Sequence, residues 1–371
     1  MQPPRIIVSG GGTGGHIFPA IAIANAIKTK HPDAAILFVG AKGRMEMEKV
    51  PDAGYKIEGL WISGLQRKLT LQNLAFPLKV ISSLLKARKI IKKFKPDIAI
   101  GVGGYASGPL LKAAGSMGIA TMIQEQNSFP GITNKLLAQK ANQICVAYDD
   151  MNRWFPKDKI IKTGNPVRRK MVEIRGKREL AIQHFGLDPN KKTVFCMGGS
   201  LGARTINHSV ASMLSAFGNQ QVQLIWQTGK LYHEQALEAI SAHAGGHICV
   251  KDFIYEMDLA YAAADIIVSR AGAMSISELS LVGKPAILIP LPSAAEDHQT
   301  KNAQALVDKN AGILIPDANC KAALSKTVFE LLSDDVRQQE LGSNIRTMAM
   351  PDADIRIAEI ALGLISNTRT S

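Results

Sequence analysis

The sequence is poor in residue types that mark several classes of protein. Only four of its 371 residues are cysteine, and they form no C-x-x-C pair or cysteine–histidine cluster, which argues against a disulfide framework or a zinc site. Aromatic residues make up 5% and no nucleic-acid-binding motif is present, so we expect no nucleic-acid partner. No run reaches the roughly 18 apolar residues of a membrane-spanning helix. With 46% apolar and 20% charged residues, the composition is that of a globular chain.

The N-terminus and the cysteines fit an intracellular chain. Residues 1–9 enter a glycine-rich stretch after a very short apolar run, without the long apolar segment of a secretory signal. Cys145, Cys196 and Cys249 stand in apolar runs, where a cysteine is usually a small core side chain. We therefore expect a cytoplasmic protein with buried thiols.

The excess of positive over negative charge is confined to one half of the chain. Residues 1–163 carry 23 Lys and Arg against 10 Asp and Glu, whereas residues 164–371 carry 21 of each. This asymmetry predicts an anionic partner for the first half only. The densest stretch is residues 67–96, with nine basic residues and no acidic one. Leu78, Ile81 and Leu85 recur there at helical spacing, so the stretch fits either an anionic bilayer surface or an ordinary core-facing helix with a basic outer side.

Short apolar runs alternate with helical patterns along the whole chain. Strands are expected at residues 5–10, 34–40, 96–104 and 120–126, and the same alternation restarts at residue 191. Strands separated by helices predict parallel sheets with ligands at their carboxyl ends. We therefore expect an α/β protein with two Rossmann-like domains, joined within residues 162–170, where Gly164 and Pro166 interrupt the pattern.

Three glycine-rich turns follow predicted strands, at residues 10–15, 101–108 and 198–204. The first has the G-x-G-x-x-G spacing of dinucleotide-binding folds, but the second strand ends in Gly40-Ala41-Lys42 rather than in the acid that would bind a ribose. A P-loop is excluded because its motif, G-x-x-x-x-G-K-[ST], requires a lysine where His16 and its neighbours stand. Glycine turns of this kind either place helix N–H groups around an anion or serve steric needs alone.

Two side chains beside these turns can carry chemistry. His16 follows the first turn, where an imidazole with an ordinary pKa near 6.5 can accept a proton or can brace the loop as a hydrogen-bond donor. Ser275 and Glu278 have the spacing of a helix capping box. The alternative is that Glu278 binds the vicinal hydroxyls of a ribose.

The order and spacing of eight motifs resemble the MurG family, the UDP-N-acetylglucosamine:N-acetylmuramyl-(pentapeptide) pyrophosphoryl-undecaprenol N-acetylglucosaminyltransferases of bacterial peptidoglycan synthesis. The motifs are GGTGGHIFPA, ISGL, GVGGYASGP, EQNSFPGITNKLLA, GNPVR, GGSLGAR, SRAGAMSISEL and DHQTKNA. The resemblance runs from about Ile6 to beyond Pro351. One departure is Gln124, where the family often has histidine. A role for a histidine at that place is therefore not carried over.

The resemblance implies a GT-B glycosyltransferase fold, in which two Rossmann-like domains face a cleft. Residues 1–164 would receive the lipid-linked acceptor, residues 165–345 would bind UDP-GlcNAc, and a C-terminal helix at about 346–371 would pack back on the first domain. The family acts as a peripheral protein at the cytoplasmic face of the inner membrane. The basic first half agrees with an anionic lipid partner.

The resemblance also implies the roles of individual residues. Arg168 would bind the UDP phosphates together with Ser200, Ile254 would lie against the uracil and hydrogen-bond it through its backbone, and Glu278 would bind the ribose. The residues implied for UDP-GlcNAc are Thr13, Gly14, Gly15, Asn127, Arg168, Ser200, Ile254, Ala273, Met274, Ser275, Ile276, Ser277, Glu278 and Gln299. Those implied for the acceptor diphosphate are Gly14, Gly15, Gly103, Gly104 and Tyr105.

These roles lead to an inverting transfer of GlcNAc to the MurNAc 4-hydroxyl of lipid I, which forms lipid II. His16 would take the proton, and N–H groups at a helix start would stabilise the departing diphosphate together with Arg168. UDP-GlcNAc is a co-substrate, and we expect neither a resident cofactor nor a metal. The competing hypotheses are a UDP-sugar epimerase, an NAD(P)-dependent oxidoreductase and a non-catalytic carrier of polyprenyl diphosphate.

Overall fold

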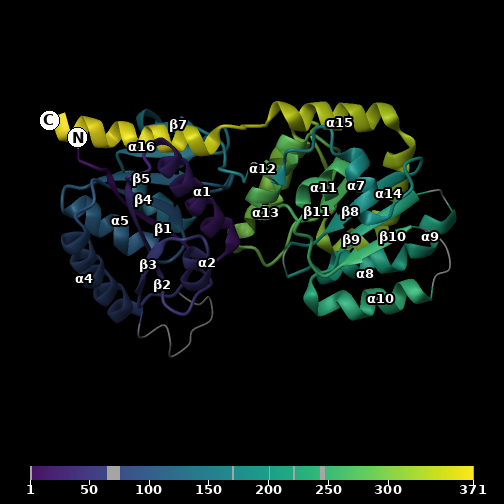
Figure 1. Ribbon diagram of the computed structural model, residues 1–371, viewed down its shortest axis with the longest axis horizontal. Helices are drawn as coiled ribbons and strands as arrows, with labels where there is room; N and C mark the ends of the chain where they lie inside the picture. Colours follow the sequence, from purple (N-terminus) through teal and green to yellow (C-terminus); the bar gives the residue numbers. More distant parts are fainter. Residues whose placement is uncertain are drawn as a thin grey trace. The chain divides into compact units, whose positions relative to one another are not determined.

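The computed structural model describes residues 2–64, 76–168, 171–199, 201–219, 222–242 and 247–370. The chain divides into two compact units (Figure 1). Unit 1 comprises Met1–Val167 and Asp352–Ser371, and unit 2 comprises Arg168–Pro351. Each unit contains one parallel sheet flanked by helices, so the two Rossmann-like folds predicted from the sequence are confirmed.

Unit 1 is built on a seven-stranded sheet with the order β3-β2-β1-β4-β5-β6-β7. Its strands are β1 Arg5–Gly10, β2 Ala35–Ala41, β3 Lys56–Leu60, β4 Ile98–Gly103, β5 Ala120–Glu125, β6 Gln143–Val146 and β7 Ile160–Lys162. Its helices are α1 Gly14–Lys30, α2 Glu46–Asp52, α4 Phe76–Phe94, α5 Ser107–Ser116, α6 Ile132–Ala138 and α16 Ala353–Thr370. Central strands such as β4 are buried along their whole length, which is why they appear in the sequence as continuous apolar runs.

The helices of unit 1 form two separate cores, one on each face of the sheet. Helices α1 and α16 share a core with one face, to which Ile23 and Ile357 both contribute. Helices α4, α5 and α6 cover the other face, where Ile91 and Leu110 are buried. The C-terminal helix α16 lies beside α1 although the two are far apart in sequence (Figure 1).

Unit 2 repeats this architecture on a six-stranded sheet with the order β10-β9-β8-β11-β12-β13. Its strands are β8 Lys192–Met197, β9 Val222–Gln227, β10 Ile248–Lys251, β11 Ile266–Ser269, β12 Ala286–Leu288 and β13 Ile313–Leu314. Its helices are α7 Arg178–Phe185, α8 Arg204–Ser212, α9 Leu214–Asn219, α10 His233–Ser241, α11 Met257–Ala263, α12 Ala273–Val282, α13 His298–Val307, α14 Cys320–Ser333 and α15 Asp335–Thr347. Helices α7, α11, α12 and α13 pack on one face, and α8, α9, α10 and α14 on the other.

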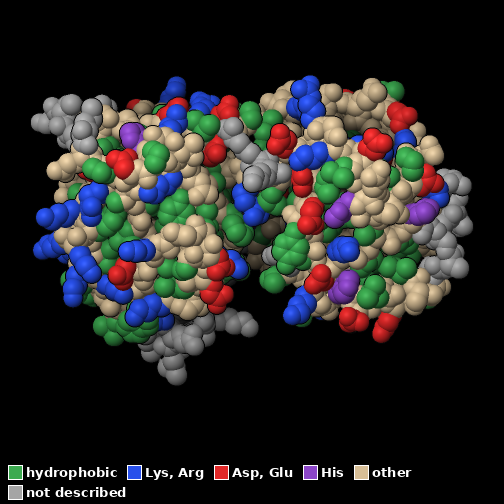
Figure 2. Space-filling model, in the orientation of Figure 1, with side chains coloured by type: hydrophobic (Ala, Val, Ile, Leu, Met, Phe, Trp, Pro, Cys, Tyr) green, Lys and Arg blue, Asp and Glu red, His purple; other side chains and the backbone are tan. Residues whose placement is uncertain are grey.

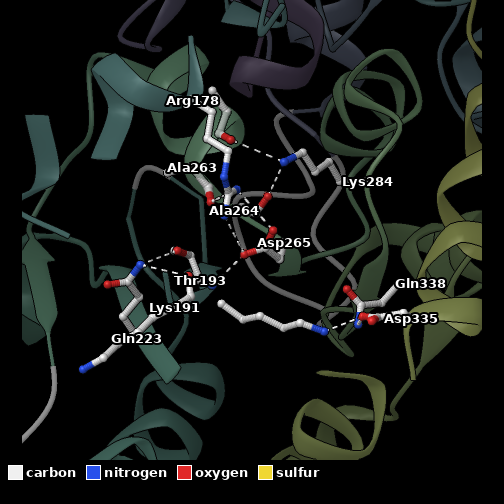
Figure 3. Close-up of polar contacts among 12 residues, drawn as sticks. Arg178, Lys191, Thr193, Gln223, Ala263, Ala264, Asp265, Lys284, Asp335 and Gln338 are labelled. Carbon is white, nitrogen blue, oxygen red and sulfur yellow. Dashed lines mark hydrogen bonds and ion pairs between the residues drawn. The ribbon is translucent and has the colours of Figure 1, made fainter. Parts of the chain in front are cut away.

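A polar network fixes the amino ends of the two central strands of unit 2 (Figure 3). The carboxylate of Asp265, just before β11, accepts from the backbone N–H of Thr193 at 2.7 Å and pairs with Arg178 of α7 at 3.1 Å. Lys284, after α12, donates to the carbonyls of Ala262 and Ala264. Burial is the main reason that the pKa of Lys284 falls to about 8. The network lies at the edge of the sheet opposite the carboxyl ends, so it anchors the helices without occupying the side where ligands bind.

One expectation about burial needs correction, and the structure shows which side of the helix that contains Leu78, Ile81 and Leu85 is exposed. Cys145 and Cys196 are fully buried as predicted, but Cys249 is only partly buried because β10 is an edge strand. In α4, Leu78, Ile81 and Leu85 are 64%, 56% and 60% exposed, so these residues do not face the core. None of the helices in the described residues has both the length and the apolar character needed to span a bilayer.

Candidate functional site

Two of the glycine turns of unit 1 meet at the point where its strand order reverses. Strands β1 and β4 are neighbours, with Ile6 opposite Ile98, and the chain leaves them in opposite directions, to β2 and to β5. Helix α1 follows β1 and helix α5 follows β4. The crevice beyond the carboxyl ends of two such strands is where open α/β sheets bind their ligands.

The two turns contact each other through atoms that leave no room for side chains. The N–H of Gly11 donates to the carbonyl of Gly103 at 3.3 Å. A Cβ at Gly104 would lie 2.4 Å from the carbonyl oxygen of Gly11, and one at Gly103 would lie 2.5 Å from Cδ2 of His16. Both glycines also have a positive φ, +112° and +88° for Gly103 and Gly104. Glycine is therefore required for the close approach of the two turns.

At the start of helix α1, two backbone N–H groups make no hydrogen bond within the described residues. Its N-cap is Thr13, whose side chain makes no capping hydrogen bond, and its first turn contains no acidic residue. The N–H groups of His16 and Ile17 donate to the carbonyl of Thr13. Within the described part of the chain, no acceptor pairs with the N–H groups of Gly14 or Gly15. A helix start of this kind attracts an anion through its unpaired N–H groups and its dipole.

His16 lies half-buried in the first turn of α1. Its Nδ1 is 3.1 Å from the carbonyl oxygen of Gly11 and 3.4 Å from Oγ1 of Thr13. Because a carbonyl oxygen can only accept, this contact calls for a proton on Nδ1, and a neutral ring with that proton would have Nε2 as its basic nitrogen. The ring thus stands beside two uncapped N–H groups, next to the place where an anion could bind.

Asn127 and Tyr105 lie beside the same carboxyl ends of the unit 1 sheet. The buried carboxylate of Glu125, at the end of β5, accepts from the backbone N–H and side-chain amide of Asn127 at 3.0 and 3.2 Å and from Asn134 at 2.8 Å. Burial raises the pKa of Glu125, and these hydrogen bonds oppose the rise. Tyr105 follows Gly104 and is 46% exposed. Asn127 is thus held rigidly, and the phenol ring is accessible.

Unit 2 has the corresponding reversal point between β8 and β11. Helix α8 follows β8 with Ala203 as its N-cap, and neither α8 nor α12 has a capping hydrogen bond from the N-cap side chain. The turn before α8 is tight: Gly199 and Gly202 have φ of +82° and +77°, and a Cβ at Gly202 would lie 2.0 Å from the carbonyl oxygen of Thr228. Ser200, predicted to bind phosphate in this turn, lies outside the described residues. Two uncapped helix starts therefore flank the reversal point.

The structure excludes a capping box at Ser275 and Glu278. Helix α12 begins at Ala273 with Gly272 as its N-cap, so Ser275 is inside the helix. Oε2 of Glu278 instead accepts from the hydroxyl of Tyr261 at 3.1 Å. Burial raises the pKa of Glu278, whereas the Tyr261 hydrogen bond and the charge of Arg168 lower it. Oε1 of Glu278 has no hydrogen-bond partner among the described residues, so it is available to accept from a ligand hydroxyl.

The remaining predicted donor residues also lie in unit 2. Met274, Ile276 and Ser277 stand with Ala273 in the first turns of α12. Ile254 is buried and its N–H donates to Oε1 of Gln227 at 3.0 Å, so a contact with uracil would use the carbonyl of Ile254. Oε1 of Gln299 accepts from the N–H of Leu291 at 2.9 Å, which leaves the amide N–H groups to donate.

Sequence analysis missed three side chains that support this site. Tyr261 donates to Glu278, and Gln227 accepts from the N–H of Ile254. Glu46 accepts from the N–H of Gly12 in the first glycine turn. Tyr261 stands in a helix and Gln227 at the end of a strand, in runs that look like ordinary core segments. Glu46 is one of several charges in residues 42–49. No spacing in the sequence distinguishes these residues, because their roles depend on strands and helices that meet only in the fold.

Comparisons with known proteins agree with this architecture. The model of the Glycosyltransferase family 28 N-terminal domain matches residues 6–146, and that of the family 28 C-terminal domain matches residues 193–357. The UDP-N-acetylglucosamine–N-acetylmuramyl-(pentapeptide) pyrophosphoryl-undecaprenol N-acetylglucosamine transferase of Cytophaga hutchinsonii is 58% identical over 99% of both chains. The crystal structure of Acinetobacter baumannii MurG is 27% identical, covering 97% of this chain and 100% of that one, with a TM-score of 0.80.

A more distant structure shares the fold alone. UDP-GlcNAc 2-epimerase from Neisseria meningitidis, solved with UDP-GlcNAc bound, is 15% identical and covers 97% of this chain and 100% of its own, with a TM-score of 0.67.

Two Rossmann-like parallel sheets, matched by the N- and C-terminal domain models of glycosyltransferase family 28, identify a glycosyltransferase of the GT-B fold. The chain belongs to glycosyltransferase family 28 and, within it, to the MurG transferases.

Proposed function

We propose that the chain transfers N-acetylglucosamine from UDP-GlcNAc to the 4-hydroxyl of the MurNAc unit of undecaprenyl-diphospho-MurNAc-pentapeptide, which converts lipid I to lipid II in peptidoglycan synthesis. The observation that supports this proposal is that a helix without a capping side chain begins at the reversal point of both sheets, where it could bind an anion. A transfer between two diphosphate carriers needs two such places. The printed name of the 58% identical relative agrees with this chemistry.

The donor site is assigned to unit 2. The uncapped starts of α8 and α12 would receive the diphosphate of UDP together with Arg168 and Ser200. The uracil would lie against Ile254, and the free oxygen of Glu278 would accept from a ribose hydroxyl. Residues 273–277 would line the nucleotide, and Gln299 would donate to the sugar. UDP-GlcNAc serves as a co-substrate, and no resident cofactor is proposed.

The acceptor site is assigned to unit 1. The N–H groups of Gly14 and Gly15 would receive the acceptor diphosphate, with Gly103, Gly104 and Tyr105 beside it. Two residues of unit 1 are proposed to contact the transferred sugar. They are Thr13 and Asn127, which Glu125 holds in place.

The proposed reaction is a single displacement with inversion. Nε2 of His16 takes the proton of the MurNAc 4-hydroxyl as that oxygen attacks the anomeric carbon of GlcNAc. The bond between this carbon and the diphosphate oxygen breaks, and UDP leaves with the bonding electrons. Negative charge builds on the departing diphosphate, and fixed N–H groups with the guanidinium of Arg168 stabilise it. Removing one such donor typically costs on the order of 10²-fold in rate.

Helix α4 is the proposed contact with the membrane. Trp61, Leu78, Ile81 and Leu85, named here the α4 patch, are 50%, 64%, 56% and 60% exposed. Arg88, one turn beyond Leu85, and Lys92 continue the same side of the helix and are also exposed. Figure 2 shows Lys and Arg side chains gathered along the edge of unit 1 where α4 lies. Apolar side chains beside cations fit the cytoplasmic face of an anionic bilayer, where the lipid-linked acceptor resides.

The test is UDP release measured with and without a soluble short-chain analogue of the lipid acceptor. The proposal predicts that UDP appears only with the acceptor, in equal amount to the disaccharide product. Formation of a different UDP-sugar without acceptor would instead indicate an epimerase. Binding of the acceptor with UDP-GlcNAc left intact would indicate a carrier, and nicotinamide-dependent turnover would indicate an oxidoreductase.

A further inference from the structure

One peptide unit of the first glycine turn links His16 to a buried carboxylate. The carbonyl of Gly11 accepts from Nδ1 of His16 at 3.1 Å. The N–H of Gly12, which belongs to the same peptide group, donates to Oε2 of Glu46 at 2.8 Å. In a trans peptide the C=O and N–H point in opposite directions, so the imidazole and the carboxylate bind to the two ends of one amide dipole.

Among the residues that the structure describes, the hydrogen bonds to the Glu46 carboxylate come from backbone N–H groups. Its side chain is 1% exposed, and its Oε1 accepts from the N–H of Ala41 at 3.0 Å. A Cβ at Gly11 would lie 2.2 Å from Oε1, and one at Gly40 would lie 2.6 Å from Cγ of Glu46. Glycine at both positions therefore makes the space that the carboxylate fills. Both carboxylate oxygens are bound by backbone N–H groups in this space, so the side chain has one defined position beside the first glycine turn.

We propose that Glu46 is a positioning residue for His16, acting through the Gly11–Gly12 peptide. This inference rests on the proposed role of His16 as the base. The carboxylate polarises the peptide, because hydrogen bonds in a chain strengthen one another, and the carbonyl of Gly11 becomes a better acceptor for Nδ1–H. Nδ1 is thereby kept protonated, which leaves Nε2 as the nitrogen of the neutral ring that takes the proton.

The charge of Glu46 also offsets the field of helix α1. A helix start carries partial positive charge, which favours a bound diphosphate but disfavours an imidazolium. His16 stands in the first turn of α1, so a base there needs a compensating negative charge. A carboxylate placed behind the turn supplies this charge without occupying the N–H groups of Gly14 and Gly15.

The test compares Glu46→Gln with Glu48→Gln, which changes an exposed glutamate of the same helix. Glutamine keeps the size of the side chain but removes the charge and one acceptor. We expect Glu46→Gln to lower kcat by about tenfold, less than the roughly 10²-fold or larger effect of losing a general base, with the KM for UDP-GlcNAc unchanged. Glu48→Gln should match the unsubstituted enzyme. An equal kcat in Glu46→Gln would overturn the proposal.

The protonated nitrogen of His16 provides a readout that a purely structural role would not change. In ¹⁵N-histidine-labelled full-length enzyme without substrate, the proposal predicts a neutral His16 protonated at Nδ1, and a mixture of the two tautomers in Glu46→Gln. Protonation mainly at Nε2 in the unsubstituted enzyme would contradict the proposal, even if Glu46→Gln failed to fold.

The same experiments separate this inference from the role of His16 itself. If His16→Ala abolishes turnover while Glu46→Gln changes neither kcat nor the tautomer, His16 is the base and Glu46 does not position it. If His16→Ala retains full turnover, the assignment of the base is wrong. The tautomer spectrum still decides whether Glu46 fixes the ring.

Discussion

His16 is the residue on which the proposed chemistry depends. Replacing it by Ala should lower kcat by about 10²-fold or more, because a positioned base is lost. The affinity for UDP should stay the same, since the proposed contacts of the nucleotide belong to unit 2. Steady-state kinetics and titration calorimetry with UDP would measure both. The matched control is His31→Ala, which changes the exposed histidine at the other end of α1. Unchanged turnover in His16→Ala would remove the residue from the role of base.

Glu278 should recognise the ribose of the nucleotide. One of its oxygens is bound to Tyr261 and the other is available, so Glu278→Gln should weaken UDP binding by about tenfold, as expected for the loss of a hydrogen bond to a charged group. The comparison ligand is 2′,3′-dideoxy-UDP, whose ribose hydroxyls are missing and whose affinity should barely change. Calorimetry would measure both affinities. An equal loss for the two ligands would show that Glu278 supports the fold rather than the ribose.

Sequence reasoning at the residue scale finds candidate side chains in turns and misses contacts whose partner is distant in sequence. His16 was identified as a candidate base because it follows a glycine turn directly. Spacing alone left two interpretations of Glu278 open, since the capping box is excluded by the start of α12 at Ala273 and the observed partner of Glu278 is Tyr261 in the preceding helix. The contact of Glu46 with Gly12 depends on β2 lying next to β1, which no local pattern reveals.

At the scale of single elements, α4 gives the clearest prediction. Replacing Leu78, Ile81 and Leu85 by Ser should reduce binding to vesicles that contain anionic lipid, because the apolar contact with the bilayer is lost. Turnover of a soluble short-chain acceptor should remain unchanged. Vesicle sedimentation and the UDP-release assay measure the two effects. Leu180→Ser is the control, since this leucine of α7 is 56% exposed but belongs to unit 2. Undiminished vesicle binding would remove α4 from the proposed interface.

The elements that sequence analysis predicted best are the buried central strands that precede glycine turns. Strands β1, β4 and β8 were expected at the right places because each is a continuous apolar run that a glycine-rich turn follows directly. Strands β3, β7 and β13 were not identified. They are short and only partly buried, so their sequences resemble loops. The exposed side of α4 could not be assigned, since both its sides carry apolar residues.

At the scale of the whole molecule, the same arrangement of a parallel sheet and its helices occurs in both units. Both units place helix N–H groups at the reversal point of a parallel sheet, but only the first half of the chain carries excess positive charge. The duplicated alternation and the charge asymmetry were both visible in the sequence. The account assigns the lipid diphosphate to the basic unit 1 and the nucleotide to the charge-balanced unit 2.

Hydrogen–deuterium exchange of the full chain tests this division most directly. Exchange would be followed with UDP alone and with a short-chain polyprenyl diphosphate alone. The account predicts that UDP slows exchange at the starts of α8 and α12, and that the lipid diphosphate slows exchange at the start of α1 and at residues 103–105. Protection of the α1 start by UDP, with no change at α8 or α12, would contradict it.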